Sequence, residues 1–252
     1  MKFTVLTLFP ELVEVFFDHG MIGRAMERKL ISGESINIRD FATDRHRTVD
    51  DRPYGGGSGM VMKPEPLGRA IRSAREKSPR AKVILMTPQG KRFNQEDACR
   101  MAEENQDLIF VCGRYEGIDE RVHSLFVDEE MSIGDYVMTG GELAAMAIID
   151  STARLIPGVL GSEASPLADS FVDGRLEHAQ YTRPERFEGI KVPEVLLSGD
   201  HGKVAQWRLK SGLTRTFLNR PDLFEQTRPS KEEKKVLLQW AQELKALAGE
   251  SV

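Results

Sequence analysis

The chain has 252 residues, of which 40% are apolar and 29% are charged, and its net charge is −4. This composition is typical of a folded soluble protein and excludes a disordered chain, and no apolar run is long enough for a membrane span. The two cysteines exclude a disulfide framework and a cysteine-based zinc site. The length predicts two domains, the N-terminus reads as a buried strand rather than a signal peptide, and the cytoplasm is the expected location.

The first 150 residues alternate between strand-like and helix-like segments. The expected strands are residues 2–8, 35–40, 82–87, 107–112 and 128–133. The expected helices are residues 11–17, 21–31, 64–77, 94–105 and 142–156, with Asn94 as a candidate N-cap. This alternation predicts an α/β fold with a mainly parallel sheet and helices on both faces.

Residues 157–174 interrupt the alternation, because Gly, Pro, Ser and Asp dominate and no periodicity survives. An interdomain linker has this composition, and so does a functional loop that orders on binding. Residues 203–218 and 230–247 then read as helices. The C-terminal part is therefore expected to be a small helical domain.

Charge is distributed unevenly along the chain. Residues 175–252 have a net charge of +3, whereas the remainder has −7. Within residues 203–220 there are five cations and no acidic residue: Lys203, Arg208, Lys210, Arg215 and Arg220. Such a stripe suits a polyanion, but a solvated helix face has the same composition, and the sequence alone leaves both readings open.

Four loops near the expected strand ends are rich in glycine and polar residues: 52–62, 87–92, 113–121 and 133–142. Ligands bind beyond the carboxyl ends of the strands in open α/β sheets, so the last three loops are expected to enclose one small molecule. The first loop does not match a P-loop, because Pro64 follows Lys63, and Met60 and Met62 break the dinucleotide fingerprint. It is expected to be a flexible loop. The five histidines lack metal-ligand spacing, so no metal site is expected.

Several motifs follow one another from end to end of the chain: MKFTVLTLFPE, RPYGGGSGMVM, TPQG, CGRYEGIDER, SIGDYVMTGGE, ARLIPGVLG, DSF, HAQYTRPE and VLLSGDHGKVAQWR. Together they resemble the bacterial tRNA (guanine-N1)-methyltransferase family of the SPOUT class, with Ser58 where that family has Pro. The resemblance implies transfer of a methyl group from S-adenosylmethionine to N1 of the guanine 3′ of the anticodon, at tRNA position 37. This modification supports reading-frame maintenance.

The same resemblance implies an architecture and partners. It implies a SPOUT-type trefoil-knotted parallel sheet with flanking helices, and a small helical C-terminal domain. Residues 1–160 are then the catalytic domain that binds S-adenosylmethionine, residues 161–174 a flexible linker, and residues 175–252 the tRNA-binding domain. The implied partners are tRNA and a second copy of the chain, in a homodimer with shared active sites and no membrane association. A requirement for Mg²⁺ stays open.

Site residues are implied by position within these motifs. Asp169 matches the proposed general base and Arg154 the group near guanine O6; on residue type alone, Asp169 could cap a turn and Arg154 could offset a helix dipole. The implied cofactor-binding residues are Pro88, Gly113, Tyr115, Glu116, Ile133, Gly134, Asp135, Tyr136, Val137, Met138, Gly140 and Gly141. The candidate tRNA-binding residues are His46, Ser170, Lys203, Trp207, Arg208, Lys210 and Arg215.

The chemistry of the implied reaction explains why a base and a cation are expected. Guanine N1 carries a proton at neutral pH, so methylation needs a group to take that proton and a donor for the charge that develops on O6. No metal or covalent intermediate is required, because a sulfonium is already a reactive electrophile.

Two other classes of protein stay open. A small-molecule kinase would need a phosphate motif, which these loops lack. A non-catalytic RNA-binding module would leave the three glycine loops without a role. Neither class is expected to bind S-adenosylmethionine.

Overall fold

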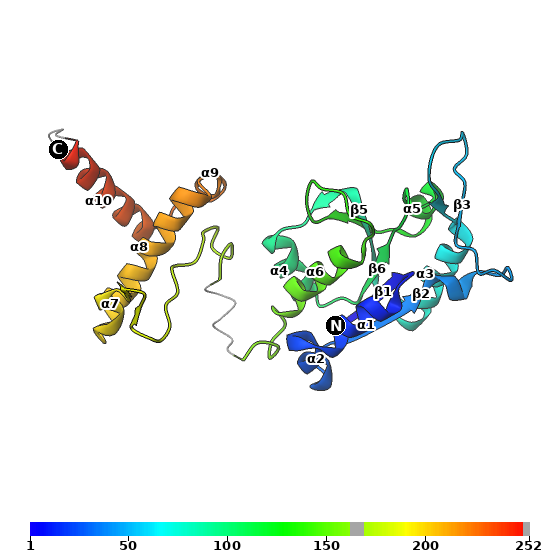
Figure 1. The fold of residues 1–252 in the computed structure, drawn as a ribbon, viewed down its shortest axis with the longest axis horizontal. Helices are drawn as coiled ribbons and strands as arrows, with labels where there is room; N and C mark the ends of the chain where they lie inside the picture. The colour runs from blue at the N-terminus through cyan, green and yellow to red at the C-terminus, as the bar shows by residue number, and fades with distance from the viewer. Residues whose placement is uncertain (162–168, 249–252) are drawn as a thin grey trace. The chain divides into compact units, whose positions relative to one another are not determined.

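The computed structural model describes residues 1–161 and 169–248. The chain divides into two compact units, Met1–Glu163 and Ala164–Val252, which Figure 1 shows in blue to green and in yellow to red. Across the described residues, no helix is both long enough and apolar enough to cross a membrane.

The first unit is built around a five-stranded sheet in the order β2-β1-β6-β5-β7, and every neighbouring pair is parallel. Its strands are β1 (Lys2–Thr7), β2 (Ser32–Asn37), β5 (Lys82–Arg92), β6 (Leu108–Cys112) and β7 (Glu129–Ser132). A short antiparallel hairpin, β3 (Asp50–Asp51) with β4 (Val61–Met62), carries the first glycine-rich loop. The predicted α/β class with a parallel sheet is confirmed.

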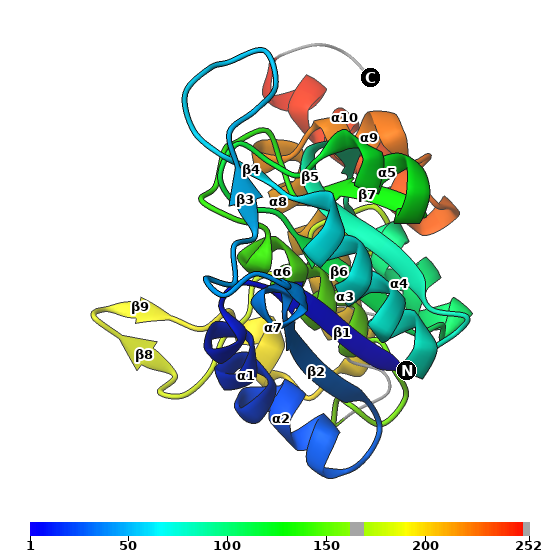
Figure 2. The same cartoon turned by 90° about the vertical axis from the view of Figure 1, so that its right-hand side faces the viewer.

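Helices cover both faces of this sheet (Figure 2). One face packs against α1 (Pro10–Asp18), α2 (Gly20–Glu27), α4 (Gln95–Glu104) and α6 (Glu142–Ala153). The other packs against the 3₁₀ helix η1 (Ile38–Phe41), α3 (Pro64–Lys77) and α5 (Glu120–Phe126). In β6, Phe110 and Cys112 point to the first layer and Ile109 and Val111 to the second, so the strand is buried on both sides.

Two helix boundaries follow directly from local sequence. The helix predicted at 64–77 is confirmed as α3, which begins at Pro64. Proline is favourable at the first helical position because its φ is already helical and because the N–H it lacks would have no partner within the helix. Asn94 caps α4 as predicted, because its side chain accepts a hydrogen bond from the Asp97 N–H at 3.0 Å.

The predicted boundaries between residues 21 and 40 are wrong. Helix α2 ends at Glu27 rather than at residue 31, and β2 runs from Ser32 to Asn37 rather than over 35–40. The N–H of Ser32 donates to the carbonyl of Met1 at 3.1 Å, and Ser32 pairs with Lys2. Pairing with β1 therefore starts the strand three residues early, in a segment whose own composition is weakly strand-like.

Strand β5 continues through the segment predicted to be the second loop. Its register with β7 shifts between Met86 and Lys91, both of which pair with Met131. Residues 87–90 therefore form a bulge within β5, and the strand continues after them to Arg92. A Cβ at Gly90 would overlap the backbone of Glu130 and Met131, so only glycine fits at this position.

In its described residues, the second unit contains helices and one short hairpin, β8 (Arg186–Phe187) with β9 (Ile190–Lys191). Its helices are α7 (Glu194–Leu197), α8 (His201–Asn219), α9 (Asp222–Gln226) and α10 (Lys231–Leu247). Ser230 and Glu233 form a capping box at the start of α10. The buried Arg175 donates to Glu233 at 3.0 Å and to the carbonyl of Leu223 at 3.0 Å, which links α9 to α10.

Part of the predicted linker folds against this helical unit. The Phe171 N–H donates to the carbonyl of Arg175 at 2.6 Å, and the Ser170 hydroxyl accepts from the Glu177 N–H at 3.0 Å. Residues 162–168, also assigned to the linker, lie outside the described residues. The boundaries 1–160, 161–174 and 175–252, with the roles implied for them, remain predictions.

Candidate functional site

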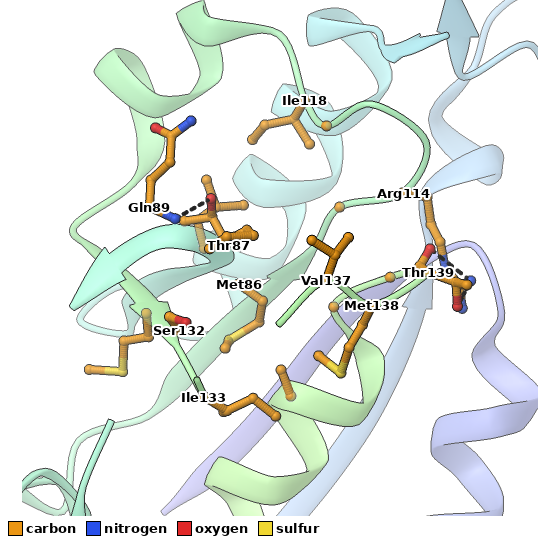
Figure 3. Close-up of a pocket in the computed structure, with 18 of the residues that line it drawn as sticks. Met86, Thr87, Gln89, Arg114, Ile118, Ser132, Ile133, Val137, Met138 and Thr139 are labelled. Carbon is orange, nitrogen blue, oxygen red and sulfur yellow. Dashed lines mark hydrogen bonds between the residues drawn. The ribbon is translucent and has the colours of Figure 1, made fainter. Parts of the chain in front are cut away.

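The bulge in β5 and the loops after β6 and β7 meet at one pocket of about 520 Å³. Figure 3 shows Thr87 and Gln89 reaching it from the β5 bulge, Arg114 and Ile118 from the loop after β6, and the segment Val137–Thr139 from the loop after β7. The N-terminal turn of α6 completes the wall through Gly141 and Ala144. This is the carboxyl edge of a parallel sheet, where ligands bind in such folds.

All the predicted cofactor-binding residues except Asp135 line the pocket: Pro88, Gly113, Tyr115, Glu116, Ile133, Gly134, Tyr136, Val137, Met138, Gly140 and Gly141. Asp135 does not line it. Its exposed carboxylate lies 3.9 Å from Nη1 of Arg92 instead. Residues 133–136 form a bend, in which the Tyr136 N–H donates to the carbonyl of Gly134 at 3.0 Å, and Asp135 lies at the exposed side of this bend.

Close backbone approach shapes this wall. A Cβ at Gly141 would lie 2.9 Å from Cβ of Met86 and 3.0 Å from Cα of Cys112, so any side chain there would press into the sheet. The Gly141 N–H donates to the carbonyl of Gly113 at 3.1 Å, which joins the loop after β7 to the loop after β6. The wall thus presents main-chain groups to a ligand, with few side chains in the way.

Several polar lining residues were absent from the sequence prediction: Gln89, Arg114, Glu120, His123, Ser132 and Thr139. Most belong to the same loop motifs as the predicted residues, so position within the motif was the available signal. His123 comes instead from the middle of α5, and its Nδ1 lies 2.7 Å from the carboxylate of Glu130. No strand-end pattern points to it.

The first glycine-rich loop contacts this site, which the sequence did not indicate. The Glu116 N–H donates to the carbonyl of Met60 at 3.0 Å, and the Met62 N–H donates to the carbonyl of Gly117 at 2.9 Å. The loop between β3 and β4 therefore supports the loop after β6 from outside.

Cys112 ends β6 beneath the pocket and is fully buried. Burial, with the neighbouring carboxylate of Glu142, holds the pKa of its thiol well above the usual value. A thiol in this environment stays protonated, so Cys112 is a packing residue and not a nucleophile. Among the described residues, no group of His, Cys, Asp and Glu side chains could hold a metal ion.

The two predicted catalytic residues do not come from the pocket loops. Arg154 is the C-cap of α6, whereas the pocket lies at the N-terminus of that helix. A helix of 12 residues is roughly 18 Å long, and an arginine side chain spans less than half of this length. Arg154 therefore does not reach the pocket of its own chain. Asp169 belongs to the second unit.

Four cations of the predicted basic stripe occupy two faces of α8, and the fifth, Arg220, is the C-cap of that helix and lies 2.7 Å from Asp222. At 100° per residue, Lys203 and Lys210 share one face, and Arg208 and Arg215 share another roughly 140° away. On the first face, Nζ of Lys203 lies 3.4 Å from Asp200 and Nζ of Lys210 lies 3.9 Å from Glu243. Arg208 and Arg215 are exposed and have no ion-pair partner among the residues described.

The other candidate tRNA-binding residues occupy separate places. The ring of Trp207, on α8, lies 6.1 Å from the ring of Tyr181 and 6.2 Å from that of His178. Ser170 is bonded within its turn, as described above. His46 is exposed in the loop between η1 and β3, on the first unit.

Fold and pocket together define an α/β protein with a small-molecule pocket at the carboxyl edge of a parallel sheet. Residues 1–226 match the family model described as tRNA (Guanine-1)-methyltransferase TrmD. The tRNA (guanine-N(1)-)-methyltransferase of Desulfatibacillum aliphaticivorans is 54% identical over 97% of this chain and 93% of its own. The enzyme of the same name from Geotalea uraniireducens is 52% identical over 99% of this chain and 99% of its own. The one from Clostridium perfringens is 53% identical over 94% of this chain and 99% of its own. The chain belongs to the tRNA (guanine-1)-methyltransferase family, and the resemblance of its motifs is confirmed.

Proposed function

We propose that the protein transfers the methyl group of S-adenosylmethionine to N1 of guanine 37 in tRNA, the nucleotide immediately 3′ of the anticodon. It would thereby support reading-frame maintenance in the cytoplasm. The observation that carries this proposal is membership, over almost the whole chain, of a family of tRNA (guanine-1)-methyltransferases.

The pocket fits the proposed methyl donor in size and chemistry. Its volume of about 520 Å³ falls within the usual range for small-ligand sites. Tyr115 and Tyr136 line it and are suited to flank an adenine ring, and glycine backbone leaves room for close contact. Glu116 and Glu120 favour a cationic ligand over a phosphorylated one, which counts against the kinase alternative. When bound, S-adenosylmethionine supplies a methyl group activated by its sulfonium.

We assign the proton transfer to Asp169 and the stabilisation of charge to Arg154. A carboxylate at position 169 would accept the N1 proton of guanine, and the guanidinium of Arg154 would donate to O6, where negative charge develops as N1 becomes nucleophilic. The chain needs no nucleophile of its own for this transfer, in keeping with the protonated thiol of Cys112.

The position of Arg154 supports a homodimer with shared active sites. Since Arg154 and the pocket lie at opposite ends of α6, a site that contains both takes Arg154 from a second chain. Leu12 and Val15 of α1 and Leu143 of α6 are exposed on two helices that contact each other. Exposed apolar side chains on adjoining helices are common at interfaces, and a second copy is the proposed partner.

The strand order supports the trefoil knot of the SPOUT class. After β5 the chain returns as β6, between β1 and β5, and then forms β7 on the far side of β5. The segment after β7 comes back to the end of β6, where Gly141 bonds to Gly113. A chain that doubles back on itself in this way is what such a knot requires.

The helical second unit is the proposed tRNA-binding domain, with residues 1–160 as the catalytic domain and 161–174 as the linker between them. Exposed cations on α8, together with the aromatic side chain of Trp207, suit a ribose-phosphate backbone and unstacked bases. His46, on the first unit, is the proposed phosphate contact outside this domain.

Nucleoside analysis tests the proposed function. Unmodified tRNA carrying guanine at position 37 is incubated with the protein and S-adenosylmethionine bearing a deuterated methyl group, then digested and analysed by mass spectrometry. The proposal predicts labelled 1-methylguanosine. Label on another guanine atom, or no label at all, would contradict it, and the kinase and RNA-binding alternatives both predict no label.

A further inference from the structure

Arg114 and Glu142 form an ion pair inside the wall of the pocket. Nη2 of Arg114 lies 3.0 Å from Oε2 of Glu142, and Nε donates to Oε1 at 3.2 Å. The side chain of Glu142 is 1% exposed and that of Arg114 is 19% exposed. Arg114 belongs to the loop after β6, and Glu142 is the first residue of α6. The proposed chemistry uses neither side chain.

The remaining contacts of this pair reach the loop after β7 and the end of β1. Nη1 of Arg114 donates to the carbonyl of Thr139 at 3.2 Å, in the loop after β7 (Figure 3). The guanidinium stacks 4.5 Å from the ring centre of Phe9, and Oε1 of Glu142 accepts from the hydroxyl of Thr7 at 2.7 Å. The pair therefore connects the end of β1, the loop after β6, the loop after β7 and α6.

The backbone at Gly140 lies close against the Arg114 side chain. A Cβ at Gly140 would overlap the guanidine end of the Arg114 side chain. The loop after β7 thus passes directly over Arg114, and the donors of Arg114 point inward to that loop and to Glu142. This arginine is occupied by the fold and is not available to hold an RNA phosphate.

We propose that the Arg114–Glu142 pair sets the spacing between the two glycine-rich loops of the pocket, and so sets the affinity for the cofactor. Arg114 and Glu142 are positioning residues in this account, acting through Gly113, Thr139 and Gly140. This inference rests on the proposed function, because the cofactor is S-adenosylmethionine. The planar, forked guanidinium is required because it bonds Glu142 through Nη2 and Thr139 through Nη1, two positions that the single nitrogen of a lysine cannot occupy together.

Calorimetry with S-adenosylmethionine, combined with thermal unfolding, tests the proposal. Arg114→Lys is expected to raise the dissociation constant by about tenfold, which corresponds to the loss of roughly one hydrogen bond. The matched control is Arg121→Lys, in the first turn of α5 directly after the same loop, where an exposed arginine pairs with Asp119 at 2.7 Å and does not line the pocket. In the transfer reaction, KM for S-adenosylmethionine should rise with Arg114→Lys, while KM for tRNA and kcat stay close to those of the wild type.

A double variant separates positioning from stability. Removing one partner would leave a buried charge unpaired, whereas Arg114→Met with Glu142→Met removes both charges at similar volume and is expected to keep the melting temperature. We expect this variant to fold and still bind S-adenosylmethionine at least tenfold more weakly. Wild-type affinity in the double variant or in Arg114→Lys would overturn the positioning role. If the double variant unfolds, the dissociation constants of Arg114→Lys and Glu142→Gln for S-adenosylmethionine decide whether the pair sets the affinity. A wild-type protein that does not bind S-adenosylmethionine would overturn the proposed function itself.

Discussion

Asp169 carries the proposed proton transfer, and its neighbours provide a matched control. Asp169→Asn keeps the shape of the side chain but removes its basicity, so turnover should fall by about 10² or more. Binding of S-adenosylmethionine should be unchanged, because the pocket belongs to the other unit. Asp173→Asn, at an exposed position in the same turn region, should retain wild-type turnover. A fully active Asp169→Asn enzyme, measured by single-turnover methyl transfer, would remove Asp169 from the base role.

Glu129 makes the stability of the first unit depend on pH. It lies 2.8 Å from Lys82 and 3.3 Å from Arg100. Burial opposes its ionisation, but hydrogen bonds and charges from Lys82 and Arg100 outweigh burial and hold the pKa of Glu129 below its usual value of 4.5. A carboxyl group with a lowered folded-state pKa stabilises the fold above its unfolded-state pKa, and this contribution is lost as pH falls through the folded-state pKa.

Thermal unfolding from about pH 7 to pH 3 measures this dependence. The wild type should lose stability progressively below about pH 4.5, and Glu129→Gln should be less stable at neutral pH and lose less on acidification. Glu103→Gln, an exposed site on α4, should behave as the wild type. Parallel pH profiles for Glu129→Gln and the wild type would show that this ion pair does not contribute.

At the scale of elements, boundaries set by local chemistry could be predicted, and those set by a partner strand could not. Pro64 and Asn94 start α3 and α4 through their own backbone and side-chain groups. The bulge in β5 depends on pairing with β7, about 40 residues later, which leaves no local pattern. The glycine loops of the pocket were found from their glycines, whereas His123 was missed because it lies within a helix.

The bulge in β5 should be intolerant of any side chain at position 90. Gly90→Ala would force the backbone of β5 and β7 apart, since the added Cβ overlaps Glu130 and Met131. We expect a lower melting temperature and weaker binding of S-adenosylmethionine, because the bulge presents Pro88 to the pocket. Gly161→Ala, where a Cβ meets nothing within 4 Å, is the control. An unchanged melting temperature and an unchanged affinity for S-adenosylmethionine in Gly90→Ala would show that the bulge can accommodate a side chain at this position.

The two faces of α8 should contribute unequally to tRNA binding. Lys203 and Lys210 are already paired with carboxylates, whereas Arg208 and Arg215 have no ion-pair partner in the described chain. Replacing Arg208 and Arg215 by Gln should weaken tRNA binding and lower the slope of log Kd against log salt by roughly one unit for each lost phosphate contact. The same change at Lys203 and Lys210 should have a smaller effect. Equal effects of the arginine and the lysine substitutions would contradict the proposal that the face with Arg208 and Arg215 binds tRNA.

For the whole molecule, the composite site makes a prediction about mixed dimers. A pocket variant, Gly141→Leu, and Arg154→Ala should each be nearly inactive. In a purified heterodimer of the two, one site combines the intact pocket of one chain with the intact Arg154 of the other, so about half of the wild-type activity should return. An inactive heterodimer, with both parents folded, would exclude Arg154 from acting across the dimer.

A second mixed dimer serves as the control. If Arg154 and Asp169 both act on the partner's pocket, a heterodimer of Arg154→Ala with Asp169→Asn has one defect in each site and stays inactive. Recovery of activity in that pair would show that the two residues of a site come from different chains.

The most direct measurement of the central claim is oligonucleotide mapping of two tRNA transcripts that differ only at position 37. After incubation with the wild-type enzyme and S-adenosylmethionine, each transcript is cleaved by ribonuclease and its fragments are sequenced by mass spectrometry. The account predicts one added methyl group on N1 of the guanine at position 37, and none anywhere in the transcript with adenine there. A methyl group elsewhere in the guanine transcript, or equal methylation of both, would contradict it.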